Sequence, residues 1–278
     1  MLKQRIITAV VLLALLVPAL LATSPVYFTV LTLLFMGAAA WEWARMQGLR
    51  APWSVASGIA IAAVLWLMFV LDVNPSKARL PFSWVVLLIW GPGLVWMLRQ
   101  GLSRWSSLPV SLRLGLGWCA IAVAWLALVH AKAIGLNFLA SVLALVWAAD
   151  IAAYFGGRAW GRRKLAPQIS PGKTWAGAWS GVSAVCLLAL VWIWADAQVA
   201  TSDASIYTYL WQRWHWGAGI GLLLLVGLSI AGDLVESMVK RVAGVKDSSG
   251  LLPGHGGVLD RIDALLPVLP VALAMASW

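Results

Sequence analysis

The sequence predicts an all-α, polytopic integral membrane protein, and three observations support that prediction. Of the 278 residues, 62% are hydrophobic and only 11% are charged, whereas ordinary globular domains have about 25% charged and 45–50% apolar residues. The apolar residues form long runs, and several of the 20 Trp stand at the ends of these runs, where interfacial anchors lie. These observations exclude a water-soluble enzyme, a disordered chain and a nucleic-acid-binding domain as the main interpretation.

A helix needs about 20 apolar residues to cross the hydrocarbon core of a bilayer. We identify nine candidate runs, roughly 6–23, 27–44, 55–71, 83–98, 114–131, 138–154, 175–194, 217–234 and 264–276. The first follows Lys3 and Arg5, as in a signal peptide, but we interpret it as a retained helix because it opens a series of similar runs. The last is short, and Pro267 and Pro270 predict a kink in it.

Lys and Arg are distributed unevenly between alternate loops. The N-terminus and the loops on its side of the membrane hold 16 of the 20 basic residues, and the opposite side holds four. Because basic loops are retained in the cytoplasm, we expect about nine transmembrane helices, with the N-terminus cytoplasmic and the C-terminus extracytoplasmic. The net charge of +10 then reflects contact with anionic membrane lipid, and no nucleic acid is expected as a partner.

The acidic residues divide the chain into two regions. Residues 1–132 hold about five predicted helices with short loops, and Glu42 and Asp72 are their only acids, whereas eight of the ten acids follow Asn137. We therefore expect a catalytic membrane region over 133–278, with its active-site loops on the cytoplasmic face. Cys119 and Cys186 lie within apolar runs and indicate neither a disulfide framework nor a metal cluster.

Asp150 lies in the sixth apolar run, near its predicted cytoplasmic end. A carboxylate at membrane depth is costly and is a functional hypothesis by default. Two interpretations are open: an ion pair with Arg158 or a neighbouring Lys, or a carboxylate that faces a polar cavity.

Glycine and basic residues accumulate between Gly156 and Thr174, ending in the string Ser-Pro-Gly-Lys-Thr at 170–174. Free N–H groups at a helix start favour phosphate there. The string invites a P-loop interpretation, which we exclude because Pro167 stands where the first Gly is required and no strand is predicted before it. The basic residues at 162–164 either bind phosphate or anchor the chain on anionic lipid.

The densest group of ionisable residues lies between 232 and 263. Asp233 and Glu236 are spaced i,i+3, as are Asp260 and Asp263, so each pair shares a helix face. Mg²⁺ binds carboxylate and phosphate oxygens, Lys and Arg bind phosphate, and the glycines around His255 let a ligand approach the backbone. Together these parts predict a Mg²⁺–nucleotide site at the membrane surface.

Simpler interpretations of the same residues remain open. Glu236 precedes Lys240 by four positions, so the two form a stabilising pair on a helix surface. An acid at the start of the last helix stabilises the helix dipole. His255 can serve a purely structural role.

Residues 237–263 resemble the signature of phosphatidate cytidylyltransferases, also called CDP-diacylglycerol synthases. The pattern is Ser, any residue, an aliphatic residue and Lys-Arg, then Lys-Asp, Leu-Pro-any-His-Gly-Gly and Asp-Arg-aliphatic-Asp, and it runs unbroken from Ser237 to Asp263. The resemblance extends to Asp150 and the string at 170–174, so it covers about 147–263. The family usually has Glu two residues after that string, where this chain has Ala176.

The resemblance implies that CTP and phosphatidic acid react to give CDP-diacylglycerol and pyrophosphate in phospholipid biosynthesis. It also implies Mg²⁺ as cofactor, a homodimer, and a multi-pass protein of the bacterial inner membrane with its site facing the cytoplasm. The implied catalytic residues are Asp260, Asp263, Lys246, Asp247 and His255. The implied substrate-binding residues are Lys173, Thr174, Ser170, Arg158, Lys240, Arg241, Arg261, Gly256 and Gly257. The implied metal ligands are Asp260, Asp263, Asp233 and Asp150.

Two other functions compete with this one. A CTP-dependent lipid-alcohol kinase would use the γ-phosphate and release CDP in place of pyrophosphate. A membrane transporter would place charged residues through the midplane and open a path to the outer face, whereas most acids here lie at the predicted cytoplasmic ends of the helices.

Overall fold

The computed structural model describes residues 2–71, 91–99, 101, 105–199 and 203–276. Within these residues, seven helical segments are long and apolar enough to cross a membrane: Lys3–Leu21, Pro25–Met46, Ala51–Val70, Val110–Ile134, Leu136–Trp160, Trp175–Gln198 and Ile206–Val242. The prediction of a helical, multi-pass membrane protein is confirmed. The first half of the fourth predicted run, 83–98, lies outside the described residues, and the count of nine crossings stays a prediction.

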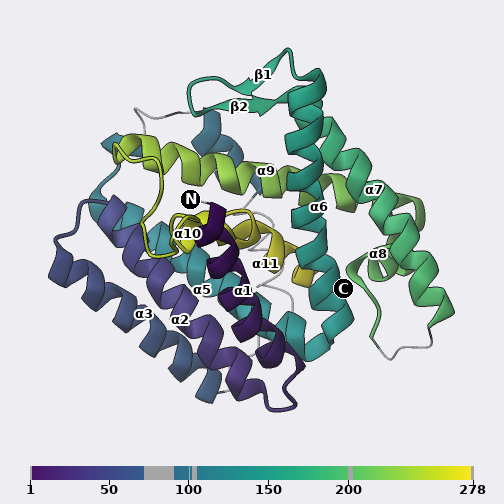
Figure 1. The fold of residues 1–278 in the computed structure, drawn as a ribbon, viewed down its shortest axis with the longest axis horizontal. Helices are drawn as coiled ribbons and strands as arrows, with labels where there is room; N and C mark the ends of the chain where they lie inside the picture. The colour runs from purple at the N-terminus through teal and green to yellow at the C-terminus, as the bar shows by residue number, and fades with distance from the viewer. Residues whose placement is uncertain (1, 72–90, 100, 102–104, 200–202, 277–278) are drawn as a thin grey trace.

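The first helices form one side of the bundle (Figure 1). Helices α1 (Leu2–Leu21), α2 (Pro25–Met46), α3 (Ala51–Val70) and α5 (Val110–Ile134) follow one another along the chain, and α2 packs against both α3 and α5. Ser24 caps α2 by accepting from the Val26 N–H, and Pro25 occupies its first turn, an arrangement that favours a helix start. Most apolar side chains of α1 are exposed on the surface of the bundle, as expected for a helix that faces lipid.

Helices α6 (Leu136–Trp160) and α7 (Trp175–Gln198) are the most closely packed pair. Their contact surface is built from small residues at four-residue spacing, Ala149 and Ala153 on α6 against Gly177 and Gly181 on α7. Small residues allow two helix backbones to approach closely in membranes. The tight pair fixes the end of α6, which carries Asp150, beside the start of α7.

A β-hairpin connects α6 to α7, which corrects the expectation that no strand precedes the Lys-Thr string. Strand β1 (Lys164–Ala166) pairs antiparallel with β2 (Ser170–Thr174), with Lys164 opposite Thr174. The segments are too short, and too rich in Pro and Gly, to show the period-two pattern that predicts a strand. The exclusion of a P-loop stands, because the string forms the strand itself and not a loop after one.

The C-terminal half completes the bundle. Helix α8 (Ile206–Trp214) and the 3₁₀ turn η1 (His215–Gly217) lead into the long helix α9 (Ala218–Val242), which is followed by the short helix α10 (Leu259–Ile262) and by α11 (Leu265–Ala276). Helix α11 lies in the middle of the molecule (Figure 1) and packs against α5, α6, α8 and α9. Buried apolar side chains gather around it, and a second group lies between α2, α5 and the end of α9.

The ninth predicted run is therefore a buried helix of 12 residues. At 1.5 Å per residue such a helix is about 18 Å long, well short of the roughly 30 Å hydrocarbon core. Every residue from Pro267 to Met275 is buried. Burial among other helices accounts for its apolar composition, and its crossing of the membrane, like the total of nine, stays a prediction.

Candidate active site

The polar segments separated in the sequence meet around one cavity of about 770 Å³. Its walls come from the end of α6, the hairpin, the start of α7, the middle of α9, and the region around α10. Eleven of the predicted site residues line it: Asp150, Arg158, Ser170, Lys173, Thr174, Asp233, Lys240, Asp247, Asp260, Arg261 and Asp263. The structure thus brings together acids and bases that lie more than 100 positions apart.

Strand β2 directs Lys173 toward helix α9. The Lys173 Nζ lies 2.6 Å from Oδ2 of Asp233, and Asp150 on α6 is close enough for its charge to interact with both. The open question about Asp150 is thus resolved in favour of a carboxylate that faces a polar cavity. Thr174, in contrast, uses its hydroxyl to cap α7 by accepting from the Gly177 N–H at 3.1 Å.

Helix α9 presents one charged face to the site. Asp233, Glu236 and Lys240 are spaced i, i+3 and i+7 and share that face, and Lys240 forms ion pairs with Glu236 and with Asp260, the latter at 2.5 Å. The predicted Glu236–Lys240 pair is present, but it is buried and not on the surface. Arg241 is exposed and does not line the cavity, because consecutive helical residues point about 100° apart.

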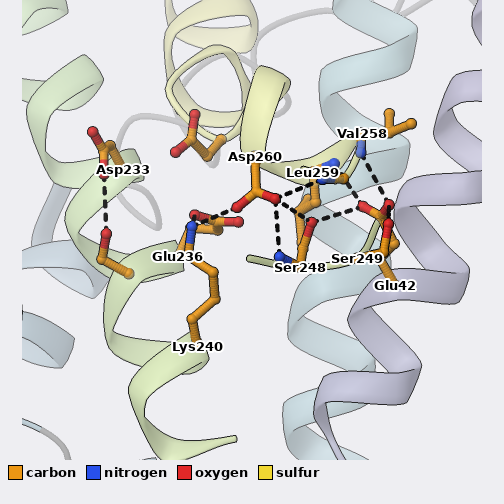
Figure 2. Close-up of polar contacts among 12 residues, drawn as sticks. Glu42, Asp233, Glu236, Lys240, Ser248, Ser249, Val258, Leu259 and Asp260 are labelled. Atoms are coloured by element: carbon orange, nitrogen blue, oxygen red, sulfur yellow. Dashed lines mark hydrogen bonds and ion pairs between the residues drawn. The ribbon is translucent and has the colours of Figure 1, made fainter. Parts of the chain in front are cut away.

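Asp260, at the start of α10, is the centre of a hydrogen-bond network (Figure 2). Its Oδ2 accepts from the N–H groups of Ser248 and Gly257, at 2.9 and 2.8 Å, and from the Ser248 hydroxyl at 2.8 Å. Burial opposes ionisation of this carboxyl, but the hydrogen bond from Lys240 and those from the two N–H groups outweigh it and lower the pKa of Asp260 to about 2. Asp260 is therefore ionised at neutral pH.

Gly256 and Gly257, the glycines after His255, allow the loop backbone to pass close to Asp260 and Ser248. Gly256 has a φ of +82°, a left-handed conformation that glycine adopts without strain, and a Cβ there would lie 2.8 Å from Oδ2 of Asp260. A Cβ on Gly257 would lie 2.1 Å from the Ser248 hydroxyl oxygen. Neither glycine lines the cavity, so their role in the structure is to let the loop close on Asp260.

Asp263 follows α10 and faces the same cavity. Its Oδ1 accepts from the N–H of Ala264 at 2.7 Å. Burial, with the negative charge of Asp233 adding to it, raises the pKa of Asp263. The site therefore holds two carboxyls whose pKa values are shifted in opposite directions, that of Asp260 lowered and that of Asp263 raised.

The acidic residues fit a divalent cation only together with a substrate. Among the described residues, no group of three or more His, Cys, Asp or Glu side chains converges closely enough to hold a metal ion. Asp150, Asp233 and Asp263 nevertheless line one cavity, and the charge of Asp233 acts on each of the others. Mg²⁺ is commonly bound by one or two carboxylates plus substrate phosphates, and this donor set matches that chemistry.

Other predicted site residues lie away from the cavity. Lys246 is exposed, and neither it nor His255 lines the walls. His255 is half-buried, and its Nδ1 has no hydrogen-bond partner in the described structure. Ala176 lies in the first turn of α7, and its methyl side chain does not line the cavity.

Sequence reasoning placed the chemistry in the C-terminal half and missed Glu42 on α2. This carboxylate is fully buried and contacts the loop that carries Asp260 (Figure 2). Its neighbour Arg45 donates to the Ser248 carbonyl at 2.6 Å. The available signal was an acid within an apolar helix, which is a functional hypothesis by default.

The fold and the cavity together define a class: a polytopic helical membrane protein with a charged cleft suited to phosphate groups. The chain belongs to the cytidylyltransferase family, whose model matches residues 3–278. It is 38% identical to the phosphatidate cytidylyltransferase of Pseudomonas aeruginosa, over all of this chain and 99% of the relative. It is 37% identical to that of Haemophilus influenzae, over 97% and 96% of the two chains. Identity to that of Brucella suis is 34%, over 95% and 89%.

Proposed function

We propose that this protein is a phosphatidate cytidylyltransferase, which converts CTP and phosphatidic acid to CDP-diacylglycerol and pyrophosphate. One observation carries the proposal: a single cavity gathers Lys173, Lys240 and Arg261 with Asp150, Asp233 and Asp263. Full-length similarity to curated enzymes of that name supports it.

The reaction demands little acid–base chemistry from the protein. The nucleophile is the phosphate oxygen of phosphatidic acid, which attacks the α-phosphorus of CTP; the bond to the β,γ-pyrophosphate breaks and pyrophosphate leaves. Because the nucleophile is already anionic at neutral pH, no strong general base is needed. The protein must align two anions and neutralise the charge that develops on transfer.

The cations of the cavity perform that task. Lys173 and Lys240 are held in place by Asp233, Glu236 and Asp260, so their ammonium groups are oriented before substrate binds. Arg158 and Arg261 add guanidinium groups on the cavity wall, which can bind phosphate oxygens in pairs. Ordered donors of this kind stabilise a transition state without reorganising during the reaction.

Asp260 and Asp263, with Asp233 or Asp150, would hold Mg²⁺. Bound there, the ion would polarise the phosphoryl oxygens and neutralise the leaving group. The carboxylate of Asp263 accepts one backbone N–H among the described contacts, which leaves acceptor positions for a cation.

The cavity lining is chemically mixed along the helices. Arg158, Lys164 and Ser170 come from the end of α6 and the hairpin, whereas Val226 and Ile230 come from turns of α9 that precede Lys240, and Ala178 and Gly181 from α7. The charged part suits the triphosphate of CTP, and the apolar part suits the glycerol and first acyl carbons of phosphatidic acid. The acyl chains would then stay in the bilayer throughout the reaction.

The charge distribution supports a cytoplasmic site, with the N-terminus inside, in the inner membrane of a bacterium. The C-terminus is proposed to lie outside, and the functional unit to be a homodimer. Lys246, Asp247, His255 and Arg241 are proposed to act on substrates that approach the exposed loop after α9.

The experiment incubates the purified full-length protein with Mg²⁺, phosphatidic acid and CTP that is labelled at the α-phosphate. Label should enter the lipid phase while pyrophosphate is released in equal amount. A lipid-alcohol kinase would instead release labelled CDP into the aqueous phase. Asp263→Asn should abolish lipid labelling while the protein still accumulates in membranes, and full activity in this variant would refute the metal assignment.

A further inference from the structure

Glu42 is a buried carboxylate with no basic partner among the described residues. It lies on α2, its exposed fraction is 0%, and the ion pairs of the described chain leave it out. An isolated buried carboxylate is costly unless hydrogen bonds compensate for its lost hydration. The compensation here comes from a segment more than 200 positions away.

Three donors point at this carboxylate, and the Ser248 hydroxyl, whose single proton is shared with Asp260, lies beside it (Figure 2). Oε1 accepts from the Ser249 hydroxyl at 2.5 Å and from the Val258 N–H at 2.9 Å. Oε2 accepts from the Leu259 N–H at 2.7 Å, with the Ser248 hydroxyl at 3.1 Å. Glu42 therefore binds both ends of the loop between α9 and α10, and it caps the first residues of α10.

The same loop ends hold Asp260. Ser248 donates its N–H and hydroxyl to Asp260 Oδ2, so the Ser248 side chain lies between the two carboxylates. Asp260 in turn accepts from Lys240. The contacts thus run from Glu42 through Ser248 to Asp260 and Lys240, the last two of which line the cavity.

The packing around Glu42 leaves no space for a different arrangement. A Cβ on Gly257 would lie 2.4 Å from Oε1 of Glu42. On the next turn of α2, Arg45 holds the Ser248 carbonyl from the same helix. Helix α2 therefore contacts the loop at several points, although it contributes no residue to the cavity walls.

We propose that Glu42 is a positioning residue of the active site: it fixes the loop between α9 and α10 so that Asp260 and Lys240 face the substrates. The proposal rests on the proposed function for its catalytic consequence. Its structural part, the fixing of the loop, stands on the contacts alone. The N-terminal half of the chain then belongs to the catalytic unit, although none of its described residues lines the cavity.

Glu42→Gln is a sharp test because Gln has almost the same shape. Both carboxylate oxygens accept a backbone N–H, and an amide can accept at only one of the two positions. In either orientation an NH₂ group faces a backbone N–H. Changes to partners that orient a catalytic or metal-binding group typically cost 10- to 100-fold in activity, so we expect kcat per folded molecule to fall about 10- to 100-fold. The Mg²⁺ concentration for half-maximal activity should rise.

Two readouts separate positioning from general stability. Hydrogen–deuterium exchange of residues 248–260 should become at least about tenfold faster in Glu42→Gln, while exchange in α6 and α7 stays unchanged. The matched control is Thr32→Val, also on α2: Thr32 is buried and accepts from the Trp125 indole at 3.1 Å. This control should lower the unfolding temperature in detergent and leave kcat and loop exchange at wild-type values.

The outcomes are distinct. If wild-type protein labels no lipid, the proposed function fails, and loop exchange still decides the role of Glu42. Wild-type exchange in the Glu42→Gln loop, or an equal loss of kcat in Thr32→Val, overturns the inference. If Glu42→Gln does not accumulate, Ser249→Ala replaces it: this change removes one of the three donors dedicated to Glu42 and should lower kcat about threefold, consistent with one hydrogen bond.

Discussion

Lys173 of β2 and Asp233 of α9 form an ion pair of 2.6 Å on the wall of the cavity. The pair joins the hairpin to α9, and the Lys173 ammonium group also acts electrostatically on two further acids of the cavity, Asp150 and Asp263. In the proposed reaction, we expect a triphosphate to compete with Asp233 for this ammonium group.

Lys173→Met should lower kcat/KM for CTP by roughly 10- to 100-fold, since a hydrogen bond to a charged group contributes about 1.5–3 kcal/mol. Initial rates of lipid labelling at varied CTP concentration measure it. Arg50→Met removes an exposed cation at the start of α3 and should leave kcat/KM unchanged. An equal loss in both variants would mean that total positive charge, and not the site, determines the rate.

Ile230→Trp should obstruct the apolar part of the cavity. Ile230 lies one turn before Asp233 on α9 and lines the wall. We expect the KM for phosphatidic acid to rise about tenfold, the size of effect that a misfit in an apolar pocket produces, with the KM for CTP within twofold of wild type. The matched control is Ile220→Trp, on the same helix but 72% exposed. A larger rise in the KM for CTP would contradict the assignment of the apolar part to phosphatidic acid.

Gly257→Ala should destabilise the protein by about 1–3 kcal/mol, the usual cost of overpacking. The added methyl group would meet both the Ser248 hydroxyl and Glu42. The unfolding temperature in detergent measures the effect, and lipid labelling should fall with it. Gly250→Ala, in the same loop, meets nothing within 4 Å and should be neutral. Equal unfolding temperatures for the two variants would show that the loop relaxes freely.

Asp196→Ala should lower the stability of the protein and leave its catalytic rate unchanged. Asp196, on α7, accepts from the Asn137 amide at 2.9 Å, the Thr208 hydroxyl at 2.6 Å and the Ser205 N–H at 3.0 Å. These bonds fix the start of α8, away from the cavity. We expect a loss of about 1.5–3 kcal/mol in the free energy of unfolding and an unchanged kcat. A tenfold fall in kcat with normal stability would contradict this separation.

Composition and run length predicted the membrane class because lipid-facing helices must be apolar over a fixed length. The same signal does not distinguish a lipid neighbour from a protein neighbour, so it did not predict that α11 is buried. Hydropathy also missed α8, because its nine residues fall between the predicted runs 175–194 and 217–234. The hairpin was not predicted because β1 and β2 have three and five residues.

The candidate site was predicted well where residues lie close in sequence. The spacing of Asp233, Glu236 and Lys240 predicts one helix face, and that face borders the cavity. Lys240 and Arg241 are adjacent in the motif, but consecutive helical residues point in different directions. Only Lys240 of the two lines the cavity. The contact of Glu42 with Val258 depends on how α2 packs against a distant loop. A local sequence pattern does not predict such packing.

The central place of α11 has a consequence for assembly. Helices α5, α6, α8 and α9 all precede it in the chain and all pack against it, so the bundle cannot close around its core until α11 is in place. Asp263 adjoins that helix and lines the cavity, so completion of the active site is tied to the same docking step.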